Sequence, residues 1–305
     1  LQNEKNDKGD LIFSDYDFEG SNLNVILDVL SYNSHLMGFY ANQLANECFL
    51  DTAKKRSSIV SRAKEFNYIP RSMVCAKAEV LVSNSQYKEG DVVAKETIFY
   101  GQSESGTLPF CVLNDIPFNK NTQTQKYVCS FSLYQGAFTS VTYTKTYDWD
   151  KFFEIPNVNV DIDEKMFKVL VYAHENSSEA IEYTRASSII ELNETSKVYF
   201  IQENWRGHYE IYFGNGLIGQ SVSLGSVIKI TYFITQGTSG NNITQFFSSD
   251  LSGKYKISVI TASYGGQPIE STESIQFLAP RNYEAQQRCV AKNDFITIVK
   301  TKYRT

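Results

Sequence analysis

The segment Asp15–Ser72 reads DYDFEGSNLNVILDVLSYNSHLMGFYANQLANECFLDTAKKRSSIVSRAKEFNYIPRS and carries the long helical signal of the chain. Its apolar residues recur at intervals of three and four, which is typical of one face of an α-helix. This face, which we call the seam, contains Leu23, Ile26, Leu27, Leu30, Met37, Tyr40 and Leu44. A second apolar face contains Val25, Val29, Tyr32, Leu36 and Phe39. A helix that is apolar on most of its circumference needs neighbours on several sides, so we expect other chains to cover it.

The pattern predicts a first helix over residues 22–47, with Ser21 as its N-cap. At a rise of about 1.5 Å per residue, this helix would be about 39 Å long. An apolar elbow follows it, and we expect Phe49 and Leu50 to anchor that elbow.

A second, shorter helix is predicted over residues 52–66, with Asp51 as its N-cap. Asn67 and Pro70 are expected to end it, because proline cannot continue a helix. From Met73 the apolar residues alternate with polar ones, which indicates strands in place of helices.

The predicted fold class is α+β, with an N-terminal long helix plus a shorter helix, followed by two mainly antiparallel β domains and a C-terminal helical segment. Strands are expected near 76–82, 93–100, 127–134, 138–147, 167–173, 197–202, 208–213, 227–235 and 257–262. The expected divisions are 1–72 (helical bundle segment), 73–148 (first β domain), 149–270 (second β domain) and 271–305 (C-terminal helical segment, split by Pro280). We expect the protein to continue beyond both ends of this chain, and we predict no structure for 101–125 or 174–192.

Composition narrows the class of protein. The chain has 305 residues, a formal net charge of −5 and a pI of about 5.4, whereas a nucleic-acid-binding protein needs a basic face. Its five cysteines include no CxxC pair, which favours reduced thiols over a disulfide framework or a zinc site. No apolar run approaches the roughly 18 residues of a membrane-spanning helix.

The motif Gly214-Asn215-Gly216-Leu217-Ile218-Gly219 matches the glycine spacing of dinucleotide-binding loops. Such a loop must open a helix whose N-terminus holds the pyrophosphate, and no helical period follows here. We therefore predict a structural turn, in which an Asn-Gly pair supplies positive φ angles. Its residues are Phe213, Gly214, Asn215 and Gly216.

Other candidate chemistry is sparse. Asp161, Asp163 and Glu164 could form paired carboxylates or a calcium site, but they lack EF-hand spacing and a solvated turn is the preferred interpretation. The three histidines are far apart and lie in no metal-binding motif. We predict no catalytic, cofactor-binding or metal-binding residue.

Two separated blocks of sequence resemble one known family. The first comprises Asp15–Ser21, Leu23-Asn24-Val25, Leu30-x-Tyr32-Asn33, Glu47-x-Phe49-x-x-Thr52-Ala53-x-x-Arg56-Ser57-Ser58 and Asn67-Tyr68-x-Pro70-x-Ser72. The second comprises Tyr212–Gly216 with Gly219, Ile230-x-Tyr232, Gly237-x-x-Gly240-Asn241, Ala262-x-x-x-Gly265-Gly266, Glu270-Ser271, Ala279-Pro280 and Gln287–Val290 with Asp294-Phe295. Together they resemble the baseplate wedge protein of contractile-tailed, T-even-like bacteriophages, which is related to the baseplate J proteins. Asn215 stands where many J-type relatives have Asp, and residues 85–200 match no pattern of the family.

The resemblance implies a structural protein of the virion tail baseplate, without enzymatic activity or a cofactor, assembled in the bacterial host cytoplasm. It implies a wedge subunit that builds the ring around the central hub and rearranges on contraction. The implied partners are a second copy of the chain, another wedge protein that contributes a bundle helix, neighbouring wedges, and the sheath-initiator and hub proteins, but no nucleic acid and no membrane. The seam, with Phe49 and Leu50, would be the bundle interface, and rigid β domains would turn about segments near Pro70 and Asp148.

Two alternatives remain open. A tail-associated β-rich carbohydrate-active enzyme would need paired carboxylates in a groove, for which the Asp161 cluster is the candidate. A fibre-attachment protein would be repetitive and trimeric, with its helix parallel to those of its own copies.

Overall fold

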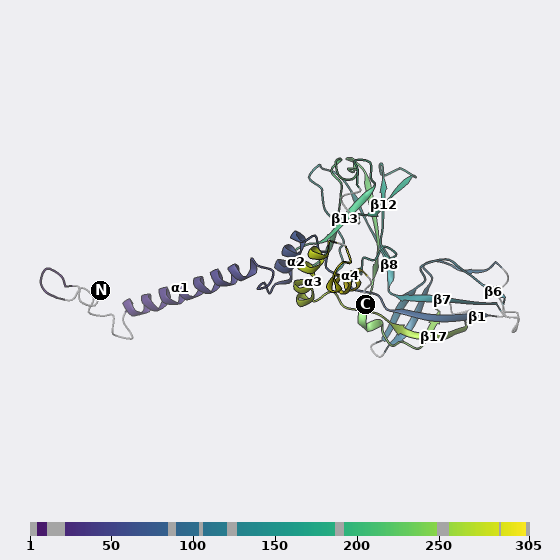
Figure 1. Cartoon of the computed structure of the whole chain (residues 1–305), viewed down its shortest axis with the longest axis horizontal. Helices are drawn as coiled ribbons and strands as arrows, with labels where there is room; N and C mark the ends of the chain where they lie inside the picture. The colour runs from purple at the N-terminus through teal and green to yellow at the C-terminus, as the bar shows by residue number, and fades with distance from the viewer. Residues whose placement is uncertain are drawn as a thin grey trace.

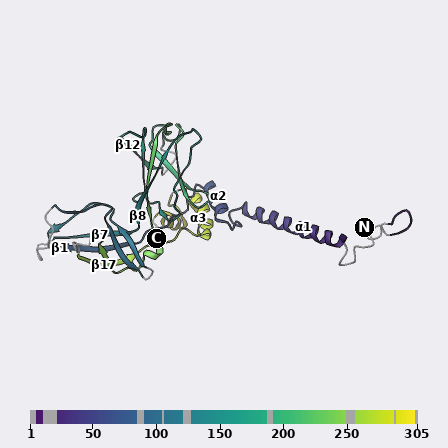
Figure 2. The same cartoon turned by 180° about the vertical axis from the view of Figure 1, so that it is seen from behind.

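The computed structural model describes residues 5–10, 22–84, 90–103, 106–120, 127–186, 192–248, 256–286 and 288–302, so the predicted cap Ser21 lies outside the described residues. Helix α1 (Asn22–Glu47) extends away from the rest of the protein, as Figures 1 and 2 show from opposite sides. A cluster of shorter helices lies at its base: α2 (Arg56–Glu65), α3 (Thr272–Ala285) and α4 (Lys292–Lys302). Two β parts lie beyond these helices, so the predicted α+β class is confirmed.

The first sheet has the order β16-β3-β4-β7-β1-β17, with β6 on β7, and all of its pairs are antiparallel. Alternate residues of β1, including Val80 and Val82, are fully buried against Phe99, Phe110 and Leu133, as a strand with one covered face requires. The strands are β1 (Lys77–Asn84), β3 (Ile98–Ser103), β4 (Gly106–Cys111), β6 (Asn119–Lys120), β7 (Tyr127–Gln135), β16 (Phe246–Ser248) and β17 (Lys256–Tyr264). Beside this sheet, β2 (Val92–Val93) pairs with β5 (Ile116–Pro117).

The second sheet has the order β10-β15-β11-β12-β13-β14-β9, with β8 on β15. Its pairs are antiparallel except β12–β13, which is parallel. Its core contains the buried side chains of Ile201, Ile211, Ile228, Ile230 and Tyr232. The strands are β8 (Ala137–Thr144), β9 (Phe153–Glu154), β10 (Val160–Asp161), β11 (Lys168–Tyr172), β12 (Ala180–Arg185), β13 (Val198–Glu203), β14 (Tyr209–Phe213) and β15 (Val227–Ile234).

The strands are not distributed between the two sheets as the domain boundaries expected at residues 148 and 270 imply. Strand β8 pairs along its whole length with β15 in the second sheet, and β17 returns to pair with β1 in the first. The chain therefore leaves the first sheet at the end of β7, builds the second sheet, and comes back after β15. Gly136 permits the passage: its φ is +133°, and a Cβ there would lie 2.1 Å from the carbonyl oxygen of Ile234.

Helix α2 begins later than predicted, and Asp51 does not cap it. Its N-cap residue is Lys55, which makes no side-chain capping hydrogen bond. The backbone N–H groups of Lys54 and Lys55 instead donate to the carboxylate of Glu47, which holds this segment in a turn. Asn67 has a φ of +54° and ends the helix, as predicted.

The C-terminal helical segment is not split at Pro280. Helix α3 continues through this residue to Ala285, and the left-handed Gln286 (φ +45°) ends it. A proline inside a helix removes one backbone hydrogen bond, but the neighbouring Leu278 and Ala279 are buried against α2. Tertiary packing therefore holds α3 together across the proline.

Candidate interaction surface

Helix α1 exposes apolar side chains on both of its predicted faces. Leu30 is 56% exposed and Leu44 is 70% exposed, and no residue of α1 is buried. Its exposed large apolar side chains are Val25, Ile26, Leu27, Val29, Leu30, Tyr32, Met37, Phe39, Tyr40 and Leu44, whereas Leu23 and Leu36 are partly exposed. Large contiguous apolar patches on soluble proteins mark interaction sites, so α1 has the character of a helix that packs against other helices. No helix among the described residues is long and apolar enough to cross a membrane.

The elbow after α1 places its two predicted anchors differently. Leu50 is 9% exposed and lies in a cluster with Ile59 and Val60 of α2 and Ile275 of α3. Phe49 is 66% exposed and is not part of this cluster. Leu50 thus fastens the elbow to the body, while Phe49 continues the exposed surface of α1.

Hydrogen bonds fix the direction in which α1 leaves the body. The side-chain amide of Gln276 on α3 donates to the carbonyl oxygens of Leu50 (2.6 Å) and Ala53 (2.9 Å). The Thr52 hydroxyl donates to the carbonyl oxygen of Asn46 at 2.7 Å. Hydrogen bonds from the side chain of Ser58 and from the backbone of the elbow lower the pKa of Glu47, which keeps its carboxylate charged as an acceptor.

A buried polar network joins the helical cluster to the second sheet. Arg56 of α2 donates to both carboxylate oxygens of Glu203 on β13, at 2.7 and 2.8 Å, and also contacts the carbonyl oxygen of Glu270. Glu203 and Glu270 are each 2% exposed. The Glu203 carboxylate is buried, whereas the Arg56 side chain is 24% exposed, so removal of Arg56 would leave a buried charge without its partner.

The segment around Pro70 is bonded to its surroundings at nearly every step. Tyr209 donates to the carbonyl oxygen of Pro70 at 3.0 Å, and Ser72 Oγ accepts from the backbone N–H of Ile162 at 3.1 Å. The backbone N–H of Cys75 donates to Asp161 Oδ2 at 3.1 Å. Asp161 is buried and also accepts from the Asp163 N–H, so it ties this joint together and is not the solvated turn expected from the sequence.

The glycine-rich motif after β14 is a closed turn. Asn215 Oδ1 accepts from the N–H groups of Leu217 and Ile218, both at 3.0 Å, and Gly216 adopts a φ of +86°. A Cβ on Gly214 would lie 2.2 Å from the carbonyl oxygen of Gly219, so only glycine fits there. The side chain of Phe213 packs against the core of the second sheet. The turn is followed by a segment without regular secondary structure and then by β15. No helix begins at this loop, so it has no helix N-terminus that could bind a phosphate.

No group of three or more His, Cys, Asp and Glu in the described part of the chain could hold a metal ion. His35 is exposed on α1. His208 Nδ1 lies 2.6 Å from Glu154, which also accepts from the Asn204 amide, so this pair braces the β13–β14 connection. The sequence analysis named Arg56 and Glu270 only as part of the family resemblance and did not name Gln276. Their structural roles were missed because each acts on a segment distant in the chain.

The protein has a body of packed β-sheets and helices, and one long helix with exposed apolar side chains extends from it. This arrangement is typical of a structural protein that assembles with other chains. Comparison with known proteins agrees with this class. A family model described as "Baseplate wedge protein gp6-like, helical domain" matches residues 5–68, which contain α1, the elbow and α2. A second, "Bacteriophage baseplate wedge protein gp6, third domain", matches residues 141–240, which form most of the second sheet.

A curated relative gives a longer match. The chain is 29% identical over 324 residues to "Baseplate wedge protein gp6" of Enterobacteria phage T4, an alignment that covers 95% of this chain and 47% of the relative. The chain thus spans about half the length of the curated relative that it matches. Two segments of the chain thus match gp6-like baseplate wedge families, and nearly the whole chain is similar to a baseplate wedge protein of a phage tail.

Proposed function

We propose that this chain is the part of a baseplate wedge subunit that enters an interchain helical bundle through α1. The observation that carries the proposal is the exposure of apolar side chains on two faces of a helix that extends away from its own body. Full burial of one such side chain contributes about 1.5–3 kcal/mol, so a bundle that covers most of them gains far more than it loses in side-chain ordering. The two apolar faces favour at least two neighbouring helices over one.

The partners that fit this surface are a second copy of the chain and a helix from another wedge protein. Further contacts would join neighbouring wedges and connect the wedge to the sheath-initiator and hub proteins, so that wedges form a ring around the hub. Similarity to the gp6 baseplate wedge protein supports these partners, and the seam, extended by Phe49, is the surface that we assign to the bundle.

Rearrangement on tail contraction is part of the proposal, but we place its hinge elsewhere than near Pro70 or Asp148. The segment near Pro70 is fastened by the hydrogen bonds of Tyr209, Ser72 and Glu270. Asp148 lies in the connection between β8 and β9, inside the second sheet. We therefore expect the helical cluster and both sheets to move as one body, with the change of angle at contacts between chains. Structures of the baseplate before and after contraction would contradict this if the two sheets turned relative to each other.

The native mass of the full chain, alone and with the other wedge proteins of the same phage, tests the bundle. A chain that lacks residues 1–45 should keep its β structure by circular dichroism and lose association, because α1 makes few contacts with the body. Equal association with and without α1 would refute the proposal. A trimer of the chain alone would favour fibre attachment, and cleavage of a host polysaccharide would favour an enzyme.

A further inference from the structure

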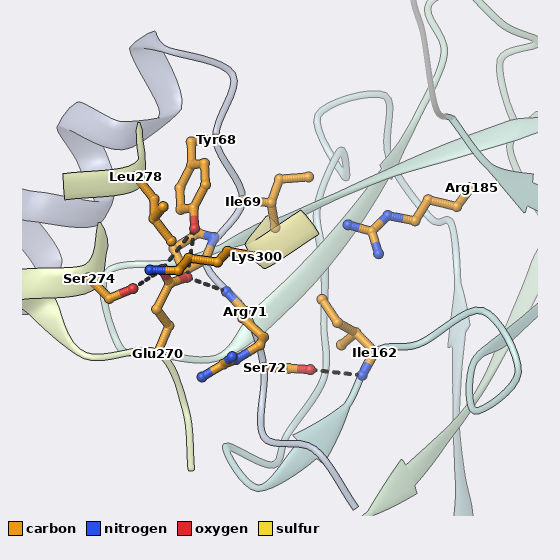
Figure 3. A pocket seen from close by; sticks show the side chains of 11 residues that line it. Tyr68, Ile69, Arg71, Ser72, Ile162, Arg185, Glu270, Ser274, Leu278 and Lys300 are labelled. Atoms are coloured by element: carbon orange, nitrogen blue, oxygen red, sulfur yellow. Dashed lines mark hydrogen bonds between the residues drawn. The ribbon is translucent and has the colours of Figure 1, made fainter. Parts of the chain in front are cut away.

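A hollow of about 300 Å³ lies where the segment 68–72, the helices α3 and α4, and the second sheet meet (Figure 3). Three of its lining residues are cationic: Arg71 in the linking segment, Arg185 at the end of β12, and Lys300 on α4. They come from three distant parts of the chain, so only the folded structure brings them together. This volume is at the lower end of the range for ligand pockets, which leaves room for one or two side chains.

The one acidic residue of the hollow is already saturated with hydrogen bonds. The carboxylate of Glu270 accepts from the Tyr68 hydroxyl (2.8 and 3.0 Å), the backbone N–H of Arg71 (2.8 Å) and the Ser274 hydroxyl (2.6 Å). Figure 3 shows these bonds on one side of the hollow, with the guanidinium of Arg185 on the other. With three cationic residues and one anionic residue, the lining has a formal charge of +2, although the whole chain has −5.

The Arg71 side chain carries an unsatisfied group at this place. Its Nε atom is buried and has no hydrogen-bond partner among the described residues. Buried donors in native proteins are nearly always paired, and one that is left unpaired destabilises the state that contains it. This nitrogen is inaccessible, so a carboxylate in the hollow would gain its charge-assisted hydrogen bonds from accessible cations of the lining such as Lys300.

We propose that this hollow receives an acidic segment of a neighbouring protein in the baseplate. The cationic lining selects a carboxylate, and arginine forks suit carboxylates because they offer parallel N–H donors. Apolar side chains stand among the cations, namely Ile69, Ile162 and Leu278. This mixture fits a peptide in which an acidic side chain lies next to an apolar one better than it fits a bare inorganic anion. The site does not use α1, so it is a second docking point, independent of the bundle.

Binding of a labelled peptide to the full chain tests this inference. The probe is a fluorescein-labelled peptide that repeats glutamate and leucine, and its matched control has glutamine in place of every glutamate. We expect fluorescence anisotropy to show binding of the acidic peptide alone, with affinity that falls as salt is raised. Arg185→Gln and Lys300→Gln should each weaken binding at least tenfold, and Lys300 is exposed, so its substitution is not expected to perturb folding.

The matched control variant is Lys168→Gln, which removes an exposed cation paired with Glu182 on the same sheet but outside the hollow. It should leave binding unchanged. Absence of peptide binding, or binding that survives both Arg185→Gln and Lys300→Gln, would overturn the proposal. Binding of inorganic phosphate at the same residues without binding of the peptide would also overturn it, since the hollow would then be a small-anion site. A chain that carries Leu30→Asp should still bind the peptide, which separates this inference from the bundle.

Discussion

Replacement of Leu30 by aspartate should abolish bundle assembly without unfolding the protein. Leu30 lies on the seam near the middle of α1 and is 56% exposed. Since full burial of a leucine side chain contributes about 1.5–3 kcal/mol, covering this exposed fraction would contribute about 0.8–1.7 kcal/mol. Aspartate loses that contribution, and its carboxylate must also be desolvated at a cost of several kcal/mol. A total of at least 3 kcal/mol is roughly a hundredfold or more in the dissociation constant.

Sedimentation velocity over a series of concentrations, with and without the partner wedge proteins, measures the association. Leu30→Ala should weaken it about tenfold, because only the packing contribution is lost. The matched control is Ser31→Asp, which puts the same charge one position further along the helix, about 100° around the helix axis from Leu30. It should leave association nearly unchanged. Thermal unfolding of the isolated chain should be nearly the same for all three variants, since residue 30 touches little of its own body.

The outcome that would refute the seam is equal association for Leu30→Asp and the parent chain. If Ser31→Asp weakened association as strongly as Leu30→Asp, the charge itself and not its position would explain the loss. A specific effect at both Leu30 and Tyr32 would support coverage of both faces.

Three further predictions concern the body. Arg56→Ala should lower the free energy of unfolding in urea by about 3 kcal/mol, because Glu203 would stay buried without its partner. The exposed pair of Arg62 and Glu65 is the control, and Arg62→Ala should lower this free energy by at most about 1 kcal/mol. Equal losses of stability in the two variants would contradict the argument from burial of Glu203. Gly136→Ala should destabilise the protein by at least about 2 kcal/mol, since the added Cβ meets a backbone carbonyl oxygen. Gly106 has a similar φ but open space around the position of its Cβ, so Gly106→Ala should destabilise the protein by about 1 kcal/mol. Urea midpoints in the reverse order would refute the predicted clash. Two of the five cysteines are exposed, so a colorimetric thiol reagent should titrate two thiols quickly in the native protein and five after denaturation, and a third fast thiol would show that a buried site opens.

The positions of several helices and strands could be predicted well from the sequence. Helix α1 occupies the predicted residues, because an uninterrupted 3.6-residue period leaves no other regular structure. Asn67 ends α2 as predicted, because asparagine tolerates a left-handed φ. The alternation of apolar and polar residues correctly predicted β1, β7, β13, β14 and β15, because a strand with one covered face has a sequence period of two.

Pairing between distant segments could not be predicted. Alternation says which face of a strand is covered, but it does not say which strand lies beside it. The expected divisions therefore placed the strand near 138–147 with the first β domain and the strand near 257–262 with the second, whereas β8 pairs with β15 and β17 pairs with β1. The prediction that Pro280 splits the last helical segment was wrong, because burial of the adjacent residues outweighs the lost hydrogen bond. Nor could the sequence say which of Phe49 and Leu50 would face α3, because they are adjacent and both apolar. The cationic hollow was missed since its charges are scattered along the chain.

The path of the chain between β7 and β15 makes the second sheet an insertion in the first. The first sheet is interrupted once, and both crossings lie side by side, where Gln135 Oε1 accepts from the Thr235 hydroxyl at 2.7 Å and from the Gln236 N–H at 2.8 Å. A polypeptide whose entry and exit points touch can be exchanged for another of different length, or removed, without breaking the sheet that hosts it. The second sheet is therefore an insertion whose length can change without loss of a strand from the first sheet, and residues 141–240 within it match a family model of their own.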